Sequence, residues 1–380
     1  MEKHSVTALT QEEKTSPQLS DIIKETIRKN GPIAFQEFME MALYYPQLGY
    51  YTSERDKIGP SGDYYTSTNL NAVFGAMIGR QLEEMWNLTG QGTFTIIEYG
   101  AGTGALCHDV LDYLQNNRPF YDHLRYCIIE KSPCMREKEK AYLADGKVSW
   151  YDSLADVGEI TGCILSNELL DNFSVHQVVM DDKLMEVYVD YENGFVELLR
   201  PAPEELKEYL KQLHITLPKG FRTEINLQAI DWIKEIAGCL KKGFVLTIDY
   251  GFPSVELYRA YRCNGTLMCY HEHQVNDDPY HHIGEQDITA HVNFSALDHW
   301  GAMNGLKCCG FTEQGYFLRS LGLMDYLRTA EKNGLFTSPD QALAIYNLLN
   351  GIGTKLKIFI QRKGVEATDL RGFSLARMGV

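Results

Sequence analysis

The sequence has no repeated Cys-x-x-Cys pairs and no regular cysteine spacing. Its nine cysteines, an odd number, are scattered along 380 residues. This pattern argues against both a disulfide framework and a zinc ribbon, since each needs cysteines in spaced pairs. The first 20 residues also lack an apolar stretch and the arginines of a transit peptide. We therefore expect a cytoplasmic protein.

The sequence is also poor in positive charge and in long apolar runs. It has 36 Lys and Arg against 51 Asp and Glu, a formal net charge of -15. Nucleic-acid binding draws on clustered Lys and Arg, so no nucleic-acid partner is expected. Nowhere do about 18 apolar residues run uninterrupted, so no membrane span is expected either. With 44% hydrophobic residues the chain can nevertheless build a sizeable core.

The N-terminal part is predicted to be helical. Residues 1–18 are polar, and we expect a disordered tail there. Residues 19–92 carry three stretches with helical spacing of apolar residues, beginning near residues 19, 33 and 72, separated by a Gly-Pro pair and by a long loop rich in Gly, Ser and Tyr. We interpret this region as an N-terminal helical cover.

From residue 93 the pattern changes to short apolar runs that alternate with helical stretches. This alternation is typical of an α/β protein with a doubly wound, Rossmann-like parallel sheet. Buried strands are predicted at residues 94–98, 126–130, 148–150, 163–166 and 244–249, and a closing pair at 311–318 and 355–361. Residues 175–200 predict an inserted antiparallel β meander, and residues 253–290 an active-site wall. The domain is expected to span residues 93–363, followed by a C-terminal tail at 364–380 without a clear element.

A glycine-rich turn follows the first predicted strand. Gly100, Gly102 and Gly104 stand between that strand and a helix, where backbone N–H groups can approach a nucleotide-like ligand. The spacing satisfies a dinucleotide-binding pattern as well, so NAD and S-adenosylmethionine (SAM) both remain open. Glu98 favours SAM, because its carboxylate can accept a hydrogen bond from an ammonium group and would repel a pyrophosphate. Glu130, at the end of the second strand, can bind both ribose hydroxyls of either cofactor.

Polar residues also follow the third and fourth predicted strands. Asp152 is a candidate acceptor for the adenine amine, or alternatively a helix cap. Asn167, Glu168 and Asp171 follow the fourth strand, at the sheet edge where open α/β folds bind ligands. An amide and two carboxylates there can orient a cationic nitrogen nucleophile, so these three residues are the candidate catalytic group; the alternative is a helix N-terminus.

No metal site is predicted. Several histidines and aspartates lie close together in the sequence, but their spacing lacks the tight arrangement of zinc ligands, which favours a polar loop surface. These residues are His271, His273, Asp277, Asp278, His281, His282, Asp287 and His291.

The residues listed so far, with several further stretches, resemble the MidA family of SAM-dependent methyltransferases. The similarity runs from about residue 31 to residue 359 and includes GYY at 49–51, GDYYTS at 62–67, SNELLD at 166–171, DYG at 249–251 and GEQDITAHVNF at 284–294. The family includes a mitochondrial arginine methyltransferase needed for assembly of respiratory complex I. This chain differs from that mitochondrial branch in the glycine-rich turn, where it has Ala101 and Thr103.

The resemblance implies a class I methyltransferase fold, SAM as cofactor and protein arginine as an acceptor. It also places Gly62, Asp63, Thr66 and Ser67 beside the cofactor. The implied partner is a protein substrate, such as a respiratory-complex subunit, and homo-oligomerisation stays open. We hypothesise methyl transfer to a nitrogen, with Glu168 and Asp171 holding a guanidinium. The alternatives are a NAD-linked oxidoreductase and a non-catalytic SAM-binding assembly factor for a respiratory complex.

Overall fold

The computed structural model describes residues 18–54, 57, 72–143, 146–332, 339–366 and 369–375. Within these residues the largest element is an eight-stranded sheet with the order β15-β16-β10-β5-β2-β3-β4, and β14 beside β10. Strands β2 to β5 and β10 run parallel, whereas β16 is antiparallel to both β10 and β15. The doubly wound α/β sheet is therefore confirmed. The strands are β2 Phe94–Tyr99, β3 Leu124–Ile129, β4 Val148–Tyr151, β5 Ile160–Asn167, β10 Leu240–Phe252, β14 Val292–Asn293, β15 Lys307–Glu313 and β16 Leu356–Lys363.

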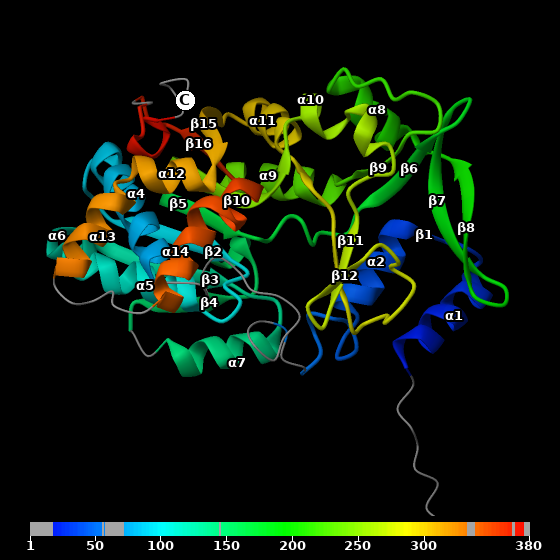
Figure 1. The fold of residues 1–380 in the computed structure, drawn as a ribbon, viewed down its shortest axis with the longest axis horizontal. Coiled ribbons are helices and arrows are strands. Elements are labelled where there is room, and N and C mark those ends of the chain that lie inside the picture. The colour runs from blue at the N-terminus through cyan, green and yellow to red at the C-terminus, as the bar shows by residue number, and fades with distance from the viewer. Residues whose placement is uncertain are drawn as a thin grey trace, which may run out of the picture.

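Helices cover both faces of this sheet, which explains the nearly continuous apolar runs in its strands. In β10, Phe244 and Leu246 belong to the core on one face and Val245 to the core on the other. The first face carries α4 Val73–Thr89, α5 Ala105–Leu114, α6 Arg118–His123, α12 Gln314–Ser320 and α14 Pro339–Asn350. The second carries α8 Glu204–Gln212, α9 Leu227–Cys239 and α11 Phe294–Met303. Helix α13 Leu323–Lys332 also packs on the first face through Leu323, whereas α7 Pro133–Tyr142 lies beyond β4 in Figure 1.

Helix α4 packs closely on α5. A Cβ atom at Gly75 would lie 2.3 Å from Cβ of Asp109, and one at Gly79 would lie 2.5 Å from the ring of Tyr113. These two glycines, one helical turn apart, let the two helices approach more closely than any larger residues would allow. Helix α4 thus packs with the large sheet, although the domain division at residue 92 stays a prediction.

A second, smaller lobe is built around the insertion (Figure 1). The predicted meander is formed by β6 His176–Met180, β7 Leu184–Tyr191 and β8 Phe195–Pro201, joined by β1 Ile33–Ala34 and β9 Arg222–Ile225. Helices α1 Leu19–Asn30 and α2 Phe35–Tyr44 pack on it, and their apolar residues share a core with Val187 and Ile288. The N-terminal helices therefore cover the insertion. A three-stranded sheet of β11 Met268–His271, β12 Gln274–Asn276 and β13 Asp287–Thr289 lies beside them.

Two segments near the C-terminus differ from expectation. Residues 311–318 were predicted as one strand, but β15 ends at Glu313 and α12 begins at Gln314. The apolar residues Phe317, Leu318 and Leu321 are buried at helical spacing, and a short apolar run does not distinguish a strand from a buried helix. The tail contains a short 3₁₀ helix at Arg371–Phe373 that was not expected. Among the described residues, no helix is long and apolar enough to cross a membrane.

The tail is predicted to stabilise the large domain through Phe373. This ring is 2% exposed, lies 5.7 Å from the ring of Phe317 and contacts Gly310. Phe373→Ala should lower the free energy of unfolding by about 3–5 kcal/mol, because a large buried ring leaves a cavity. Urea unfolding measures this, with Val255→Ala, at a residue that is 77% exposed, as control. A change no larger than that of the control would show that the tail does not contribute to the core.

Candidate cofactor and acceptor site

The glycine-rich turn lies where the strand order reverses, between β2 and β5. Gly100, Gly102 and Gly104 have φ angles of 63°, 60° and 80°, a left-handed conformation that favours glycine. Gly104 is the N-cap of α5, so the first N–H groups of this helix lack acceptors within the helix. A Cβ atom at Gly100 would lie 3.0 Å from Leu169. The turn therefore offers N–H donors at the switch point, where open α/β sheets bind ligands.

Glu98 precedes this turn, and its side chain is buried in the core rather than exposed at the turn. Its side chain is 2% exposed, on the face covered by α4 and α5, and its Oε2 accepts a hydrogen bond of 2.6 Å from Tyr126. Burial raises the pKa of Glu98 to about 7, and the hydrogen bond from Tyr126 opposes this shift. Glu98 thus links β2 to β3, and its predicted hydrogen bond with a ligand ammonium stays a prediction.

Glu130 and Asp152 follow the neighbouring strands β3 and β4, and Arg136 holds the ends of these strands together. Its Nη2 donates to the Glu130 backbone oxygen at 2.6 Å and pairs with Asp152 Oδ1 at 2.6 Å. Glu130 Oε1 accepts from the N–H of Ser132 at 2.6 Å. The two predicted cofactor residues therefore lie at one edge of the sheet. Sequence reasoning missed Arg136, which lies on α7.

The residues that follow β5 adopt an unusual conformation. Glu168 has a φ of 50°, rare for a residue with a side chain, and its N–H donates to the oxygen of Ile248 at 2.8 Å. Asn167 Nδ2 lies 3.2 Å from Glu168 Oε1, while Asn167 Oδ1 is buried without a hydrogen-bond partner among the described residues. Such strain and unpaired polar atoms concentrate at binding sites.

Asp249, in the last part of β10, holds the turn after β5 in place. Its Oδ2 accepts from the N–H groups of Leu169 at 3.1 Å and Leu170 at 2.8 Å, and Oδ1 accepts from Tyr250 at 2.9 Å. The residue is fully buried, and burial raises its pKa to about 7 against the effect of these N–H donors. Asp249 therefore fixes the positions of both Glu168 and Asp171.

Four carboxylates meet around this turn, namely Glu168, Asp171, Asp249 and Asp287; we call them the acidic cluster. Asp171 is 7% exposed and Asp287 is 4% exposed. The pKa of Asp171 lies well above its usual value because of burial and then because of the negative charges of Asp249, Asp287 and Glu168. Asp171 is therefore surrounded by negative charge.

Two tyrosines from the N-terminal lobe lie at the acidic cluster, and one of them binds Asp287. Tyr51 donates to Asp287 Oδ1 at 2.8 Å, and its ring stacks on Tyr44 at 5.5 Å. Tyr44 donates to Asn172 Oδ1 at 2.8 Å, and Asn172 donates to Tyr51 at 3.2 Å. The lobe that sequence analysis interpreted as a cover thus contributes side chains to the site.

The structure therefore brings the predicted Asn167, Glu168 and Asp171 together beside the glycine-rich turn. Asp249, Asp287 and Tyr51 were missed as site residues, although all three lie in stretches that carry the family resemblance. Gly62, Asp63, Thr66 and Ser67 lie outside the described residues. These groups suit an amino-acid ligand, since α5 offers N–H groups to a carboxylate and Asn167 Oδ1, which lacks a hydrogen-bond partner within the described part of the chain, can accept from an ammonium.

Comparison with known protein families identifies the chain. Residues 77–312 match the model of a family described as S-adenosyl-L-methionine-dependent methyltransferases. The chain belongs to this family. The methyltransferase fold, the enzyme class and SAM as cofactor, all expected from the MidA resemblance, are confirmed, and the NAD-linked alternative is wrong.

Solved structures and curated proteins that are similar to this methyltransferase agree with the family assignment. A Burkholderia thailandensis protein bound to S-adenosyl-homocysteine is 29% identical, with a TM-score of 0.84 and 94% of each chain covered. A native structure of a protein from the same organism is 30% identical, with a TM-score of 0.82 and 94% of each chain covered. The mitochondrial protein arginine methyltransferase NDUFAF7 homolog of Drosophila melanogaster is 27% identical over 93% of this chain and 86% of its own. NDUFAF7 of Mus musculus is 27% identical over 85% and 78%.

These comparisons also correct the predicted location. The expectation of a cytoplasmic protein rested on the absence of a transit peptide in the first 20 residues. It is wrong, because the curated relatives, including those of Drosophila melanogaster, Mus musculus and Homo sapiens, are named mitochondrial. A weak compositional signal at a terminus does not determine where a protein acts.

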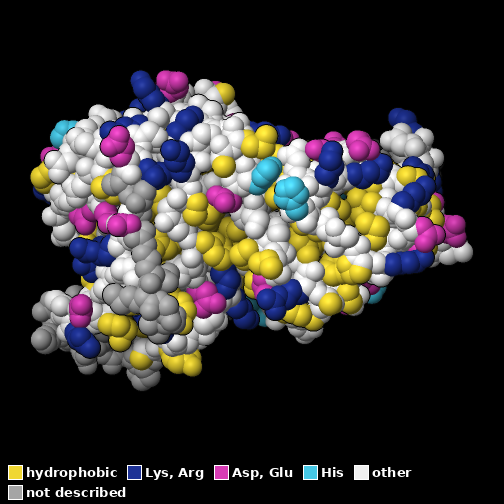
Figure 2. Space-filling model, turned by 90° about the horizontal axis from the view of Figure 1, so that it is seen from above, with side chains coloured by type: hydrophobic (Ala, Val, Ile, Leu, Met, Phe, Trp, Pro, Cys, Tyr) yellow, Lys and Arg dark blue, Asp and Glu magenta, His cyan; other side chains and the backbone are white. Residues whose placement is uncertain are grey.

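One face of the surface carries charged side chains of both signs. On the face shown in Figure 2, Lys and Arg side chains are scattered among Asp and Glu side chains. A phosphate backbone needs a concentrated basic area. The expectation that nucleic acid is not a partner stays a prediction.

The raised pKa of Glu98 predicts a pH-dependent stability. The carboxyl group titrates near 4.5 when unfolded and at about 7 when folded, so the folded state binds the proton more tightly. The stabilisation that this proton gives the folded state is fully present below pH 4.5 and is lost as the pH rises through 7. The free energy of unfolding falls by up to about 1.4 kcal/mol per pH unit in this range. Glu98→Gln should reduce this fall, as urea unfolding at pH 5, 6 and 7 would measure. Glu137→Gln, at a residue whose side chain is 76% exposed, is the control. An unchanged slope in Glu98→Gln would contradict the assignment.

Proposed function

We propose that this methyltransferase transfers a methyl group to a guanidinium nitrogen of a protein arginine. The acidic cluster is the observation that carries this proposal. A buried group of carboxylates that repel one another is stabilised by a cation, and the planar guanidinium can donate hydrogen bonds to two carboxylates at once. When bound, SAM supplies a methyl group that its sulfonium already activates.

The roles of the individual residues follow from their positions. Glu168 and Asp171 are proposed to accept hydrogen bonds from the guanidinium. Asn167, which lies 3.2 Å from a carboxylate oxygen of Glu168, orients that side chain. The nitrogen that gains a methyl group must lose a proton, and the Glu168 carboxylate is proposed to receive it. Holding the acceptor in line with the methyl group can supply about 7–11 kcal/mol of the barrier reduction.

The cofactor is proposed to lie at the carboxyl ends of β2, β3 and β4. Gly100, Gly102 and Gly104 let it approach the N–H groups of α5, and Glu130 binds the ribose hydroxyls. Asp152 and Glu98 remain candidates for the adenine amine and the ammonium group. The family resemblance adds the residues outside the described part of the chain, which are Gly62, Asp63, Thr66 and Ser67.

Relatives support arginine as the acceptor. Eight curated proteins, 24–27% identical to this chain, are named protein arginine methyltransferases. A protein substrate, such as a subunit of a respiratory complex, is consistent with arginine as the acceptor. The carboxylates of the acidic cluster account for arginine in chemical terms, since a neutral acceptor would leave their repulsion in place.

Two substitutions separate catalysis from cofactor binding. Glu168→Gln should lower turnover at least 100-fold while leaving the affinity for SAM within about twofold, because it removes the charge that faces the acceptor. Glu130→Ala should instead weaken SAM binding about tenfold or more, since it removes charged hydrogen bonds. Calorimetry with SAM and transfer of labelled methyl groups to cell lysate measure both effects.

The same labelling experiment also tests the alternative that the protein is a non-catalytic assembly factor. Binding of SAM without any labelled product would favour a non-catalytic assembly factor. Mass spectrometry of methylated arginines in a deletion strain and its parent then tests the acceptor. If no arginine loses methylation in the deletion strain, or if Glu168→Gln is fully active, the arginine assignment is wrong.

A further inference from the structure

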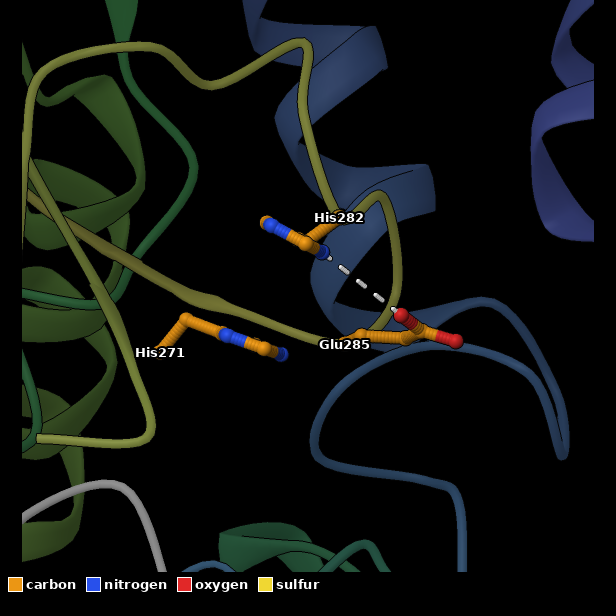
Figure 3. Close-up of side chains that lie close together, drawn as sticks. All are labelled: His271, His282 and Glu285. Carbon is orange, nitrogen blue, oxygen red and sulfur yellow. Dashed lines mark ion pairs between the residues drawn. The ribbon is translucent and has the colours of Figure 1, made fainter. Parts of the chain in front are cut away.

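Three metal-ligating side chains meet outside the acidic cluster. His271 is the last residue of β11, whereas His282 and Glu285 belong to the loop between β12 and β13. One potential ligand atom from each residue lies within 4.8 Å of the others, and the three side chains point toward one another (Figure 3). The fold thus brings together three side chains, two of them histidines whose sequence spacing favoured a polar loop surface over a metal site.

The backbone around these residues is tightly turned. The carbonyl oxygen of His282, a residue with a φ of 46°, accepts hydrogen bonds from the N–H groups of Glu285 at 2.7 Å and Gln286 at 3.0 Å. This turn places Glu285 Oε2 3.9 Å from His282 Nδ1. The rings of His271 and His282 lie almost parallel, with centroids 4.1 Å apart. The backbone of this loop therefore brings His282 and Glu285 close to each other and to His271 on β11.

A buried glutamine fixes this loop from within. Gln286 is 1% exposed, and its Nε2 donates to the oxygens of Asp278 at 2.9 Å and His281 at 2.7 Å. Its Oε1 accepts from Asn276 at 3.1 Å. The loop geometry is thus supported by hydrogen bonds of the protein itself, as a preorganised ligand group requires.

We propose that His271, His282 and Glu285 bind a divalent transition-metal ion, with Zn²⁺ as the best match. Two imidazole nitrogens and one carboxylate oxygen are a ligand set that Zn²⁺ takes in proteins, with water in the fourth position. Zn²⁺ ligand bonds of about 2 Å bring ligand atoms to roughly 3.3 Å from one another. Rotations of the exposed His282 and Glu285 side chains provide the small closure that this requires.

The ion would stabilise the wall of the acceptor site. Tyr270, next to His271, pairs with Asp287 of the acidic cluster in the β11–β13 ladder, and Glu285 lies two residues before Asp287. A metal bound here would therefore tie the end of β11 to the loop that leads into β13. Its role is structural, and the proposal does not depend on which acceptor is methylated.

Titration of the full chain, first freed of metal with a chelator, tests this site. Zn²⁺ affinity is measured by competition with a chromophoric chelator, and the ligand set by the absorption spectrum of Co²⁺. We expect one equivalent to bind, with a rise in the melting temperature. His271→Ala and Glu285→Gln should each weaken binding at least tenfold and change the Co²⁺ spectrum.

The matched control is His281→Ala, because His281 is exposed in the same loop and lies 3.5 Å from Asp278 rather than in the ligand group. It should bind Zn²⁺ like the wild type. Melting temperatures in chelator check that all variants are folded equally well. Unchanged affinity in His271→Ala and Glu285→Gln, or an equal loss in His281→Ala, would overturn the proposal and leave only adventitious binding to surface histidines.

Discussion

The hydrogen bonds from the backbone of Leu169 and Leu170 to the buried carboxylate of Asp249 hold together the centre of the acidic cluster. They join the segment after β5 to β10 and fix the turn that carries Glu168 and Asp171. A buried carboxylate is costly unless N–H donors surround it, and here three backbone donors do so. The left-handed conformation of Glu168 persists because this turn determines it.

Parallel strands explain why the cofactor turn and the acidic cluster adjoin. Tyr99 pairs with Ser166 and Ile248 pairs with Asn167, so β2 and β5 end side by side, next to Ile248 of β10. The glycine-rich turn leaves β2 toward α5, and the turn after β5 leaves beside it. Donor and acceptor groups can therefore be brought together without any movement of the sheet, as expected at a topological switch point.

Local features of the site could be predicted from the sequence. The strands, the glycine-rich turn and the residues from Asn167 to Asp171 were found because each depends on apolar patterns and turn residues close in sequence. Asp249 and Asp287 were missed as site residues, since their roles depend on contacts with distant segments. Tyr51 was missed for the same reason. Periodicity also could not show that α1 and α2 pack on the inserted meander, because an apolar helix face does not specify its partner.

Proton release on acceptor binding is the most direct test of the acidic cluster as a guanidinium site. Burial raises the pKa of both Asp171 and Asp249, and the negative charges of its neighbours raise that of Asp171 further, so a guanidinium between the carboxylates must lower these values and expel protons. Calorimetry at pH 7 with an arginine peptide and S-adenosyl-homocysteine, in two buffers of different ionisation enthalpy, measures the protons exchanged. The account predicts net release, and much weaker binding of the same peptide with neutral citrulline. Binding of both peptides with equal affinity and without proton release would contradict it.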